Sequence, residues 1–169
     1  MPDVKRRDFL KGGLAGVALA SGIGTAAKTK VAEAAASEGA APAYPVVDVA
    51  PIDSIPPGTE IPFDYPDENS PAVLLRLPGK AEGGIGPDGD IVAFSLLCTH
   101  KGCPLNFVAD RQMLVCPCHW SCFDPGKGGR LVIGQASQSL PQMKLEVQDG
   151  MVRATGIDGL IYGRHTNIL

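Results

Sequence analysis

Two short segments that combine cysteine with histidine constrain the fold of this chain more than any other feature. The first segment contains Cys98 and His100 in a C-x-H pattern, and the second contains Cys116 and His119 in a C-x-x-H pattern. Fifteen residues lie between His100 and Cys116. Thiolates and imidazoles are ligands for transition metals, and four of them from two segments bind one centre only if the segments meet. The chain must therefore fold so that two loops converge.

The residues around these segments favour β-strands. Apolar runs separated by turn residues occupy most of the chain after residue 45, and no long window there has the helical period of 3.6. The chain has 21 Gly and 15 Pro residues but only 5% aromatic residues, as is typical of a turn-rich β domain. The last two runs are joined through Gln148–Gly150 as a hairpin. We therefore predict an all-β, antiparallel domain with strands in residues 46–49, 72–77, 91–95, 113–115, 130–133, 144–147 and 151–154.

The N-terminal residues form a leader. Residues 5–11 read KRRDFLK and precede an uncharged, Gly- and Ala-rich run over 12–27, which resembles a twin-arginine export signal. A membrane-spanning helix needs about 20 predominantly apolar residues, so a cleaved leader is favoured over an anchor. The alternative is a chance arginine pair on an ordinary helix. We predict a signal peptide in 1–36, a linker or flexible arm in 37–45, and one folded domain in 46–169 that is exported to the periplasm.

The charge of the chain argues against a nucleic-acid partner. The formal net charge is −3, from 15 basic and 18 acidic residues, and no basic stripe is present. Six basic and three acidic residues precede residue 37, so the remaining chain has nine basic and fifteen acidic residues and a net charge of −6. An acidic exported protein can attract a basic redox partner, although such charge often serves only solubility.

The two Cys/His segments together match the Rieske pattern, in which two histidines replace two cysteines on one iron of a 2Fe–2S cluster. The resemblance implies that Cys98 and Cys116 bind one iron and that His100 and His119 bind the other. It also implies a Rieske-type antiparallel β-sandwich with a small cluster-binding subdomain at about 96–135. Neutral imidazoles raise the potential to roughly −150 to +300 mV, against about −400 mV for all-cysteine plant-type clusters. A tetrahedral zinc site is the alternative, but zinc ligands usually come as separate Cys pairs and His pairs.

Three further cysteines lie near these ligands. Cys103 and Cys118 stand one on each segment, and in an oxidising compartment they can pair and clamp the two loops together. Such a clamp resembles the high-potential Rieske proteins of cytochrome bc complexes and of arsenite oxidase; the alternative is two free buried thiols. Cys122 has no assigned partner, and a plain small loop residue is its expected role.

Hydrogen bonds to the sulfur atoms tune the potential of such a cluster. We assign Gly102, Ser121 and Phe123 to the surroundings of the cluster. The segment after the second histidine in bc-type proteins reads Gly-Ser-x-Tyr, whereas this chain has Trp120, Ser121 and Phe123 at the corresponding positions. Ser121 keeps one hydroxyl donor and Phe123 lacks the other, so we expect a lower potential than in bc-type relatives.

The C-terminal part narrows the resemblance to the small Rieske subunit of arsenite oxidase. The stretch Gly134–Pro141 replaces the Gly-Pro-Ala-Pro-like stretch of bc-type proteins, and the ending Gly156–Arg164 is similar to that subunit. This resemblance implies a heterodimer with a large molybdopterin subunit and a cytochrome c or cupredoxin as electron acceptor. It implies no substrate-oxidising site in this chain, and the remaining histidine, His165, is a surface residue. The alternatives are the Rieske subunit of a quinol-oxidising cytochrome bc complex and a stand-alone periplasmic carrier.

Overall fold

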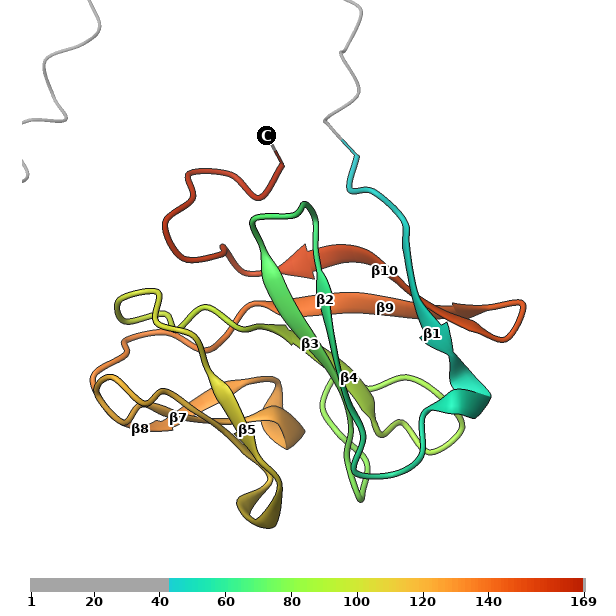
Figure 1. Cartoon of the computed structure of the whole chain (residues 1–169), viewed down its shortest axis with the longest axis horizontal. Helices are drawn as coiled ribbons and strands as arrows, with labels where there is room; N and C mark the ends of the chain where they lie inside the picture. The colour runs from blue at the N-terminus through green and yellow to red at the C-terminus, as the bar shows by residue number, and fades with distance from the viewer. Residues whose placement is uncertain (1–42, 169) are drawn as a thin grey trace, which may run out of the picture. The chain divides into compact units, whose positions relative to one another are not determined.

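Ten β-strands form the framework of residues 43–168, the part of the chain that this computed structural model describes (Figure 1). A six-stranded antiparallel sheet has the order β1-β10-β9-β4-β3-β2, and a four-stranded antiparallel sheet has the order β5-β6-β7-β8. The all-β prediction is confirmed. The strands of the larger sheet are β1 (Val47–Pro51), β2 (Glu60–Asp64), β3 (Pro71–Arg76), β4 (Ile91–Ser95), β9 (Gln142–Gln148) and β10 (Met151–Asp158).

The smaller sheet consists of β5 (Asn106–Val108), β6 (Met113–Val115), β7 (Cys122–Asp124) and β8 (Arg130–Ile133). Three single-turn 3₁₀ helices, η2 (Ile52–Ser54), η3 (Ala109–Arg111) and η4 (Pro125–Lys127), complete the elements. Within the described residues we find no helix whose length and apolar character would suit a membrane span. The predicted signal peptide and all but the last three residues of the predicted linker lie outside the described residues.

Strands β3 and β4 are apolar except for their last residues, Arg76 and Ser95, because both faces of each strand are covered. Successive side chains of a strand point to opposite faces. Leu75 therefore packs in a core that includes Leu114 and Phe123 of the smaller sheet, whereas Leu74 packs in a second core with Val152. All five residues of β4 are buried. The two sheets thus share one core, and the larger sheet has another of its own.

The predicted strands are all present, but three strands were not predicted. Strand β2 contains Pro62, which lacks an N–H donor, and it lies at the edge of its sheet, where a missing donor is tolerated. Strands β5 and β7 have only three residues each, so no alternating pattern can be recognised in them. The predicted hairpin joins β9 to β10 through Asp149 and Gly150, both with positive φ as the tight turn requires.

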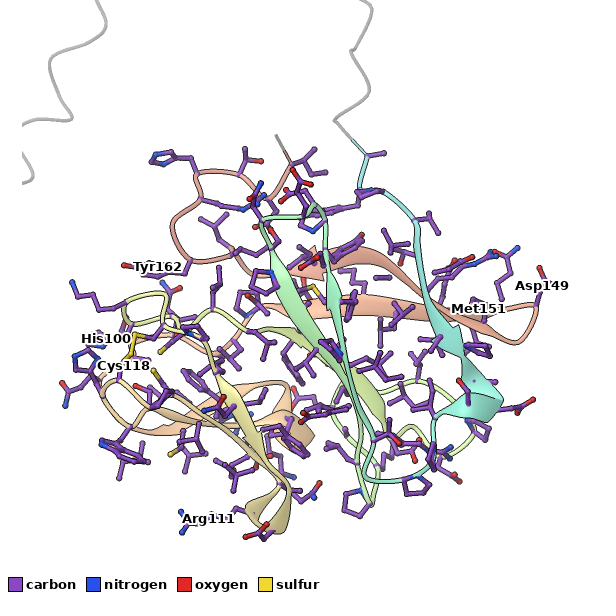
Figure 2. The ribbon with its side chains drawn as sticks, viewed as in Figure 1. His100, Arg111, Cys118, Asp149, Met151 and Tyr162 are labelled. Atoms are coloured by element: carbon purple, nitrogen blue, oxygen red, sulfur yellow. A yellow bond between two sulfur atoms is a disulfide. The ribbon has the colours of Figure 1, made fainter. Side chains whose placement is uncertain are left out.

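The C-terminal tail after β10 is folded on itself and tied to the loop between β2 and β3 by polar contacts. Asn167 accepts a hydrogen bond from the Ile161 N–H at 2.9 Å and donates to the Gly159 carbonyl at 2.8 Å. The Arg164 guanidinium donates to both carboxylate oxygens of Asp67 at 2.7 Å. These contacts fix the backbone of the segment that lies between Gly159 and Arg164, which carries Tyr162 toward the first Cys/His loop (Figure 2).

Candidate metal centre

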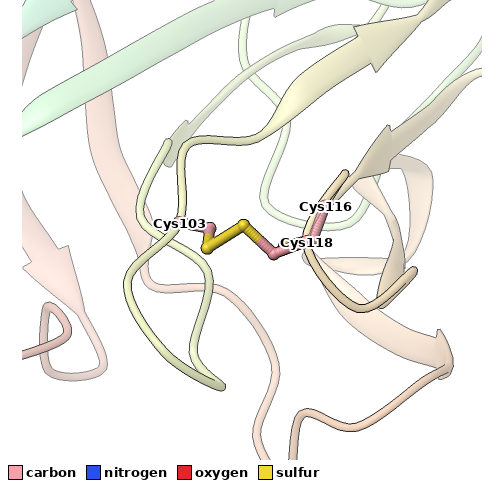
Figure 3. Close-up of side chains that lie close together, drawn as sticks. All are labelled: Cys103, Cys116 and Cys118. Atoms are coloured by element: carbon pink, nitrogen blue, oxygen red, sulfur yellow. A yellow bond between two sulfur atoms is a disulfide. The ribbon is translucent and has the colours of Figure 1, made fainter.

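A disulfide joins the two loops that carry the predicted ligands. The first loop connects β4 to β5 and the second connects β6 to β7, and Cys103 of the first is bonded to Cys118 of the second (Figure 3). The Cα atoms of the pair are 6.5 Å apart. The predicted clamp is confirmed, and the required convergence of the two segments with it.

The two loops have the same backbone construction. In the first, the Cys98 N–H donates to the Cys103 carbonyl at 2.9 Å, and the Gly102 N–H donates to the Cys98 carbonyl at 2.8 Å. In the second, the Cys116 N–H donates to the Ser121 carbonyl at 2.8 Å, and the Trp120 N–H donates to the Cys116 carbonyl at 3.0 Å. Each loop therefore closes on its own cysteine, through a left-handed residue four positions later.

The two cysteines that begin these loops lie side by side in the interior. Cys98 is fully buried and Cys116 nearly so, and neither is in a disulfide. Burial raises the pKa of the Cys98 thiol, and the adjacent Cys116 raises it further, whereas the backbone N–H groups of His100 and Lys101 donate to the sulfur and lower it. The same N–H groups stabilise a thiolate that binds a metal.

The two histidines lie next to each other on the outer side of the thiols. The rings of His100 and His119 meet edge to face with their centroids 4.7 Å apart. His100 is half-buried and His119 is exposed. The Nδ1 atom of His100 is buried without any hydrogen-bond partner, which is costly for an imidazole nitrogen unless it binds a metal.

The structure thus brings the predicted ligands together as a thiol pair and an imidazole pair. This donor set, with one sulfur and one imidazole from each loop, suits a Rieske 2Fe–2S cluster. Three sulfur atoms, those of Cys103, Cys116 and Cys118, also lie within 4.8 Å of one another. They do not form a metal site of their own, because two of them are bonded to each other. The assignment of individual ligands to the two irons stays a prediction.

The residues assigned to the surroundings of the cluster have distinct contacts. The Ser121 Oγ accepts hydrogen bonds from the N–H groups of Gln135 and Ala136, both at 3.1 Å. Its two lone pairs are therefore used, and its O–H hydrogen is free to donate to a cluster sulfur. Phe123 is fully buried in the core shared by the two sheets and offers no hydroxyl. Cys122 is a free, partly exposed thiol, but it is the first residue of β7 and not the loop residue that was expected.

Gly102 has a steric role that the sequence did not reveal. A Cβ atom at Gly102 would lie 2.6 Å from the Tyr162 ring, so the tail packs directly on the first loop (Figure 2). Whether Gly102 also contacts the cluster stays a prediction. Gly134 is a second residue that sequence reasoning missed, since a Cβ atom there would lie 2.3 Å from the Ser121 Cα. The only sequence signal for these close approaches was the presence of glycine, which lacks a Cβ atom, at positions 102 and 134.

Comparison with known proteins agrees with this site. The Rieske [2Fe-2S] domain family matches residues 46–144. The iodate reductase subunit IdrB of Denitromonas iodatirespirans is 39% identical over 97% of this chain and 86% of its own length. The iodate reductase subunit IdrB of Pseudomonas sp. strain SCT is 37% identical over 95% of this chain and 82% of its own length.

A solved structure supports the same conclusion for the fold. The soluble domain of Rieske protein II (soxF) from Sulfolobus acidocaldarius superposes with a TM-score of 0.60 and 26% identity, over 72% of this chain and 82% of that one. The family match covers more than half of the chain, and the fold and the paired thiols and imidazoles agree with it. The chain therefore belongs to the Rieske iron–sulfur family, and it is an electron-transfer protein that holds one 2Fe–2S cluster.

Proposed function

We propose that this chain is the electron-transfer subunit of an exported oxyanion oxidoreductase whose large subunit carries molybdopterin. The main support is similarity over nearly the whole chain to two iodate reductase subunits. Their name makes each of them one subunit of a larger enzyme. The twin-arginine-like leader supports export to the periplasm, because that route carries proteins that have already folded around a cofactor.

Iodate reduction and arsenite oxidation are the two reactions that the observations favour. Both exchange oxygen between water and an oxyanion, but they move electrons in opposite directions: arsenite releases two electrons on becoming arsenate, and iodate consumes electrons. The two similar subunits favour iodate. The resemblance of Gly156–Arg164 to the arsenite oxidase subunit favours arsenite. In the arsenite case we expect a cytochrome c or cupredoxin as the acceptor.

The predicted ligands have different roles in electron transfer, because the two cysteines are buried and His119 is exposed. The bound cluster supplies one-electron chemistry at a potential of roughly −150 to +300 mV. Cys98 and Cys116 are buried and would hold one iron away from solvent. His100 and His119 would hold the other, and the exposed His119 is the side chain that a partner can approach. The Cys103–Cys118 bridge keeps the two loops at a fixed separation, so that little reorganisation accompanies electron transfer.

Purification of the tagged chain from its native host tests this proposal. We expect a large molybdenum-containing subunit to copurify, and the complex to oxidise arsenite with an oxidised dye or to reduce iodate with a reduced dye. The faster reaction identifies the substrate. A copurifying cytochrome b with quinol oxidation, or a chain that purifies without any partner, would contradict the proposal. Lysine replacements of Arg6 and Arg7 should abolish periplasmic accumulation if the leader is the predicted signal.

A further inference from the structure

Trp120 has a left-handed backbone conformation, and the residue at the equivalent position of the other Cys/His loop is a glycine. The two Cys/His loops close with the same pair of backbone hydrogen bonds, and Gly102 and Trp120 occupy equivalent positions in them. Gly102 has φ +70° and Trp120 has φ +60°. A left-handed conformation costs nothing at glycine but brings the Cβ atom of any bulky residue too close to the backbone. Glycine would satisfy the second loop with less strain than tryptophan.

The indole of Trp120 gains little within this chain to offset that strain. It is 71% exposed, the highest exposure among the large apolar side chains of the described residues. It directly follows His119, the exposed imidazole of the site. Strained residues that persist at a functional site point to a function there. The favourable contacts of this side chain must therefore come from another molecule.

The surface around Trp120 is apolar and almost uncharged. Val132 and Ile133 of β8 are 61% and 67% exposed, and Ile133 is paired with Cys122, two residues after Trp120. The three loops at this end, residues 98–103, 116–122 and 133–140, contain a single charged residue, Lys101. Exposed apolar patches with little charge and a central tryptophan are typical of stable subunit interfaces. Brief encounters with soluble redox partners depend more on charge.

We propose that Trp120 is the docking anchor by which the histidine end of this chain binds the large subunit. The indole inserts into an apolar pocket on that subunit, and a carboxylate of the large subunit faces Lys101. This inference rests on the proposed function, because it needs a permanent partner. Docking here would place the exposed histidine at the interface, so electrons would pass between the subunits without crossing solvent.

Three variants of the holoprotein test the docking role: Trp120→Gly, Trp120→Phe and, as a matched control, Val147→Ala. Val147 is also exposed and apolar, but it lies on β9 near Asp149 and Met151, at the opposite end of the domain from His100 (Figure 2). The Kd of each variant for the purified large subunit is measured at two salt concentrations. We expect Trp120→Gly to raise the Kd at least tenfold at both, Trp120→Phe to recover most of the affinity, and Val147→Ala to change nothing.

The isolated holoprotein provides the second readout. Because glycine relieves the strain, Trp120→Gly should leave the EPR and visible spectra unchanged and the melting temperature unchanged or raised. A lowered melting temperature would show that the indole packs within the chain and would overturn the proposal. So would an unchanged Kd, including the case in which only reduction of a soluble acceptor is slowed. If the wild-type chain binds no large subunit at all, the proposed function fails, and this inference fails with it.

Discussion

The six-stranded sheet contains strands of up to eight residues, whereas those of the four-stranded sheet have three or four. The larger sheet has a core of its own, and the smaller one has only the core that it shares with β3 and β4. Short strands form few ladder hydrogen bonds, so the smaller sheet depends on that shared core, on the disulfide and on the cluster. The electron-transfer site is thus built on the part of the domain that is less able to fold alone.

The two regions also differ in charge. The cluster-binding subdomain, residues 96–135, has four basic and two acidic residues and a net charge of +2. The chain from residue 37 onward has a net charge of −6, so the rest of it has −8. The sequence-based expectation that the acidic protein attracts a basic redox partner must therefore be refined. The negative charge lies mainly outside the subdomain that carries the Cys/His loops.

Removal of the cluster should produce the largest difference between the two regions, because it should alter the Cys/His loops and leave the larger sheet folded. Without iron, the Cys116 thiolate is free within 4.8 Å of both bridge sulfurs. It can attack one of them, form a new S–S bond and release the other as a thiolate. After chelation of the iron under non-reducing conditions, peptide mapping should find Cys116 in a disulfide, while far-UV circular dichroism still reports the larger sheet. Cys116→Ser should keep the original bridge, and a bridge that stays intact in the wild-type apoprotein would contradict this prediction.

Matched leucine-to-alanine substitutions, one in each core, should have the next largest effect. Leu114 and Leu74 are both fully buried, but Leu114 lies in the shared core and Leu74 in the core of the larger sheet. Each Leu→Ala change should lower the free energy of unfolding by about 2–5 kcal/mol. Only Leu114→Ala should also speed the loss of the cluster to a chelator, and visible absorbance measures the rate of that loss. Equal rates of loss in the two variants would show that the smaller sheet is not separately sensitive.

Loss of the disulfide should cost about 3 kcal/mol, the entropy expected for a loop of this length. The double variant Cys103→Ser/Cys118→Ser should therefore release its cluster to a chelator much faster than the wild type. Cys122→Ser is the control, because Cys122 is a free thiol on the same sheet. A double variant that keeps its cluster as long as the control does would show that the bridge is dispensable.

The contact between the tail and the loop that joins β2 to β3, which lies wholly on the side of the larger sheet, should weaken in acid. The hydrogen bonds from Arg164 hold the pKa of Asp67 at about 2, below its ordinary value of 3.8. The stabilisation is thus complete above pH 3.8 and is lost as the pH falls through about 2. Because Asp67 is partly exposed, we expect about 1 kcal/mol. The protection of the Ile161 amide against exchange, measured relative to the intrinsic rate at each pH, should fall over this range, and Asp67→Asn should show less protection already at neutral pH; identical protection profiles would contradict the contact's role.

Ligand chemistry made the site more predictable from the sequence than the fold around it. Two thiols and two imidazoles on separate segments can serve one cluster only if the loops converge, so the residues of the site were found by their spacing. The bridge between Cys103 and Cys118 followed from the family resemblance and from the expected export to an oxidising compartment. Strands β5 and β7 were missed because their pairing with neighbours, and not a pattern of their own, makes them strands.

Contacts between distant segments were beyond prediction for a different reason. The packing of Tyr162 on Gly102 and the close approach of Gly134 to Ser121 depend on where the tail and β8 pass over the loops. A glycine in the sequence indicates freedom of the backbone, but it does not indicate which segment will occupy the space. The exposure of Trp120 was equally hidden, since tryptophan next to a ligand could as well have packed inside.

Phe123→Tyr should have the smallest effect and should act on the potential alone. A tyrosine hydroxyl at this position would donate to the electron-rich reduced cluster and favour it, as the Tyr of bc-type relatives implies. A hydrogen bond worth about 1 kcal/mol corresponds to roughly 40 mV for one electron, so the midpoint should rise by that order. Phe123→Leu is the control, because it keeps an apolar side chain without a donor. Redox titration that finds no rise for the tyrosine variant, with its cluster retained, would show that the buried ring at 123 points away from the cluster sulfurs and would contradict the expectation of a potential lowered by Phe123.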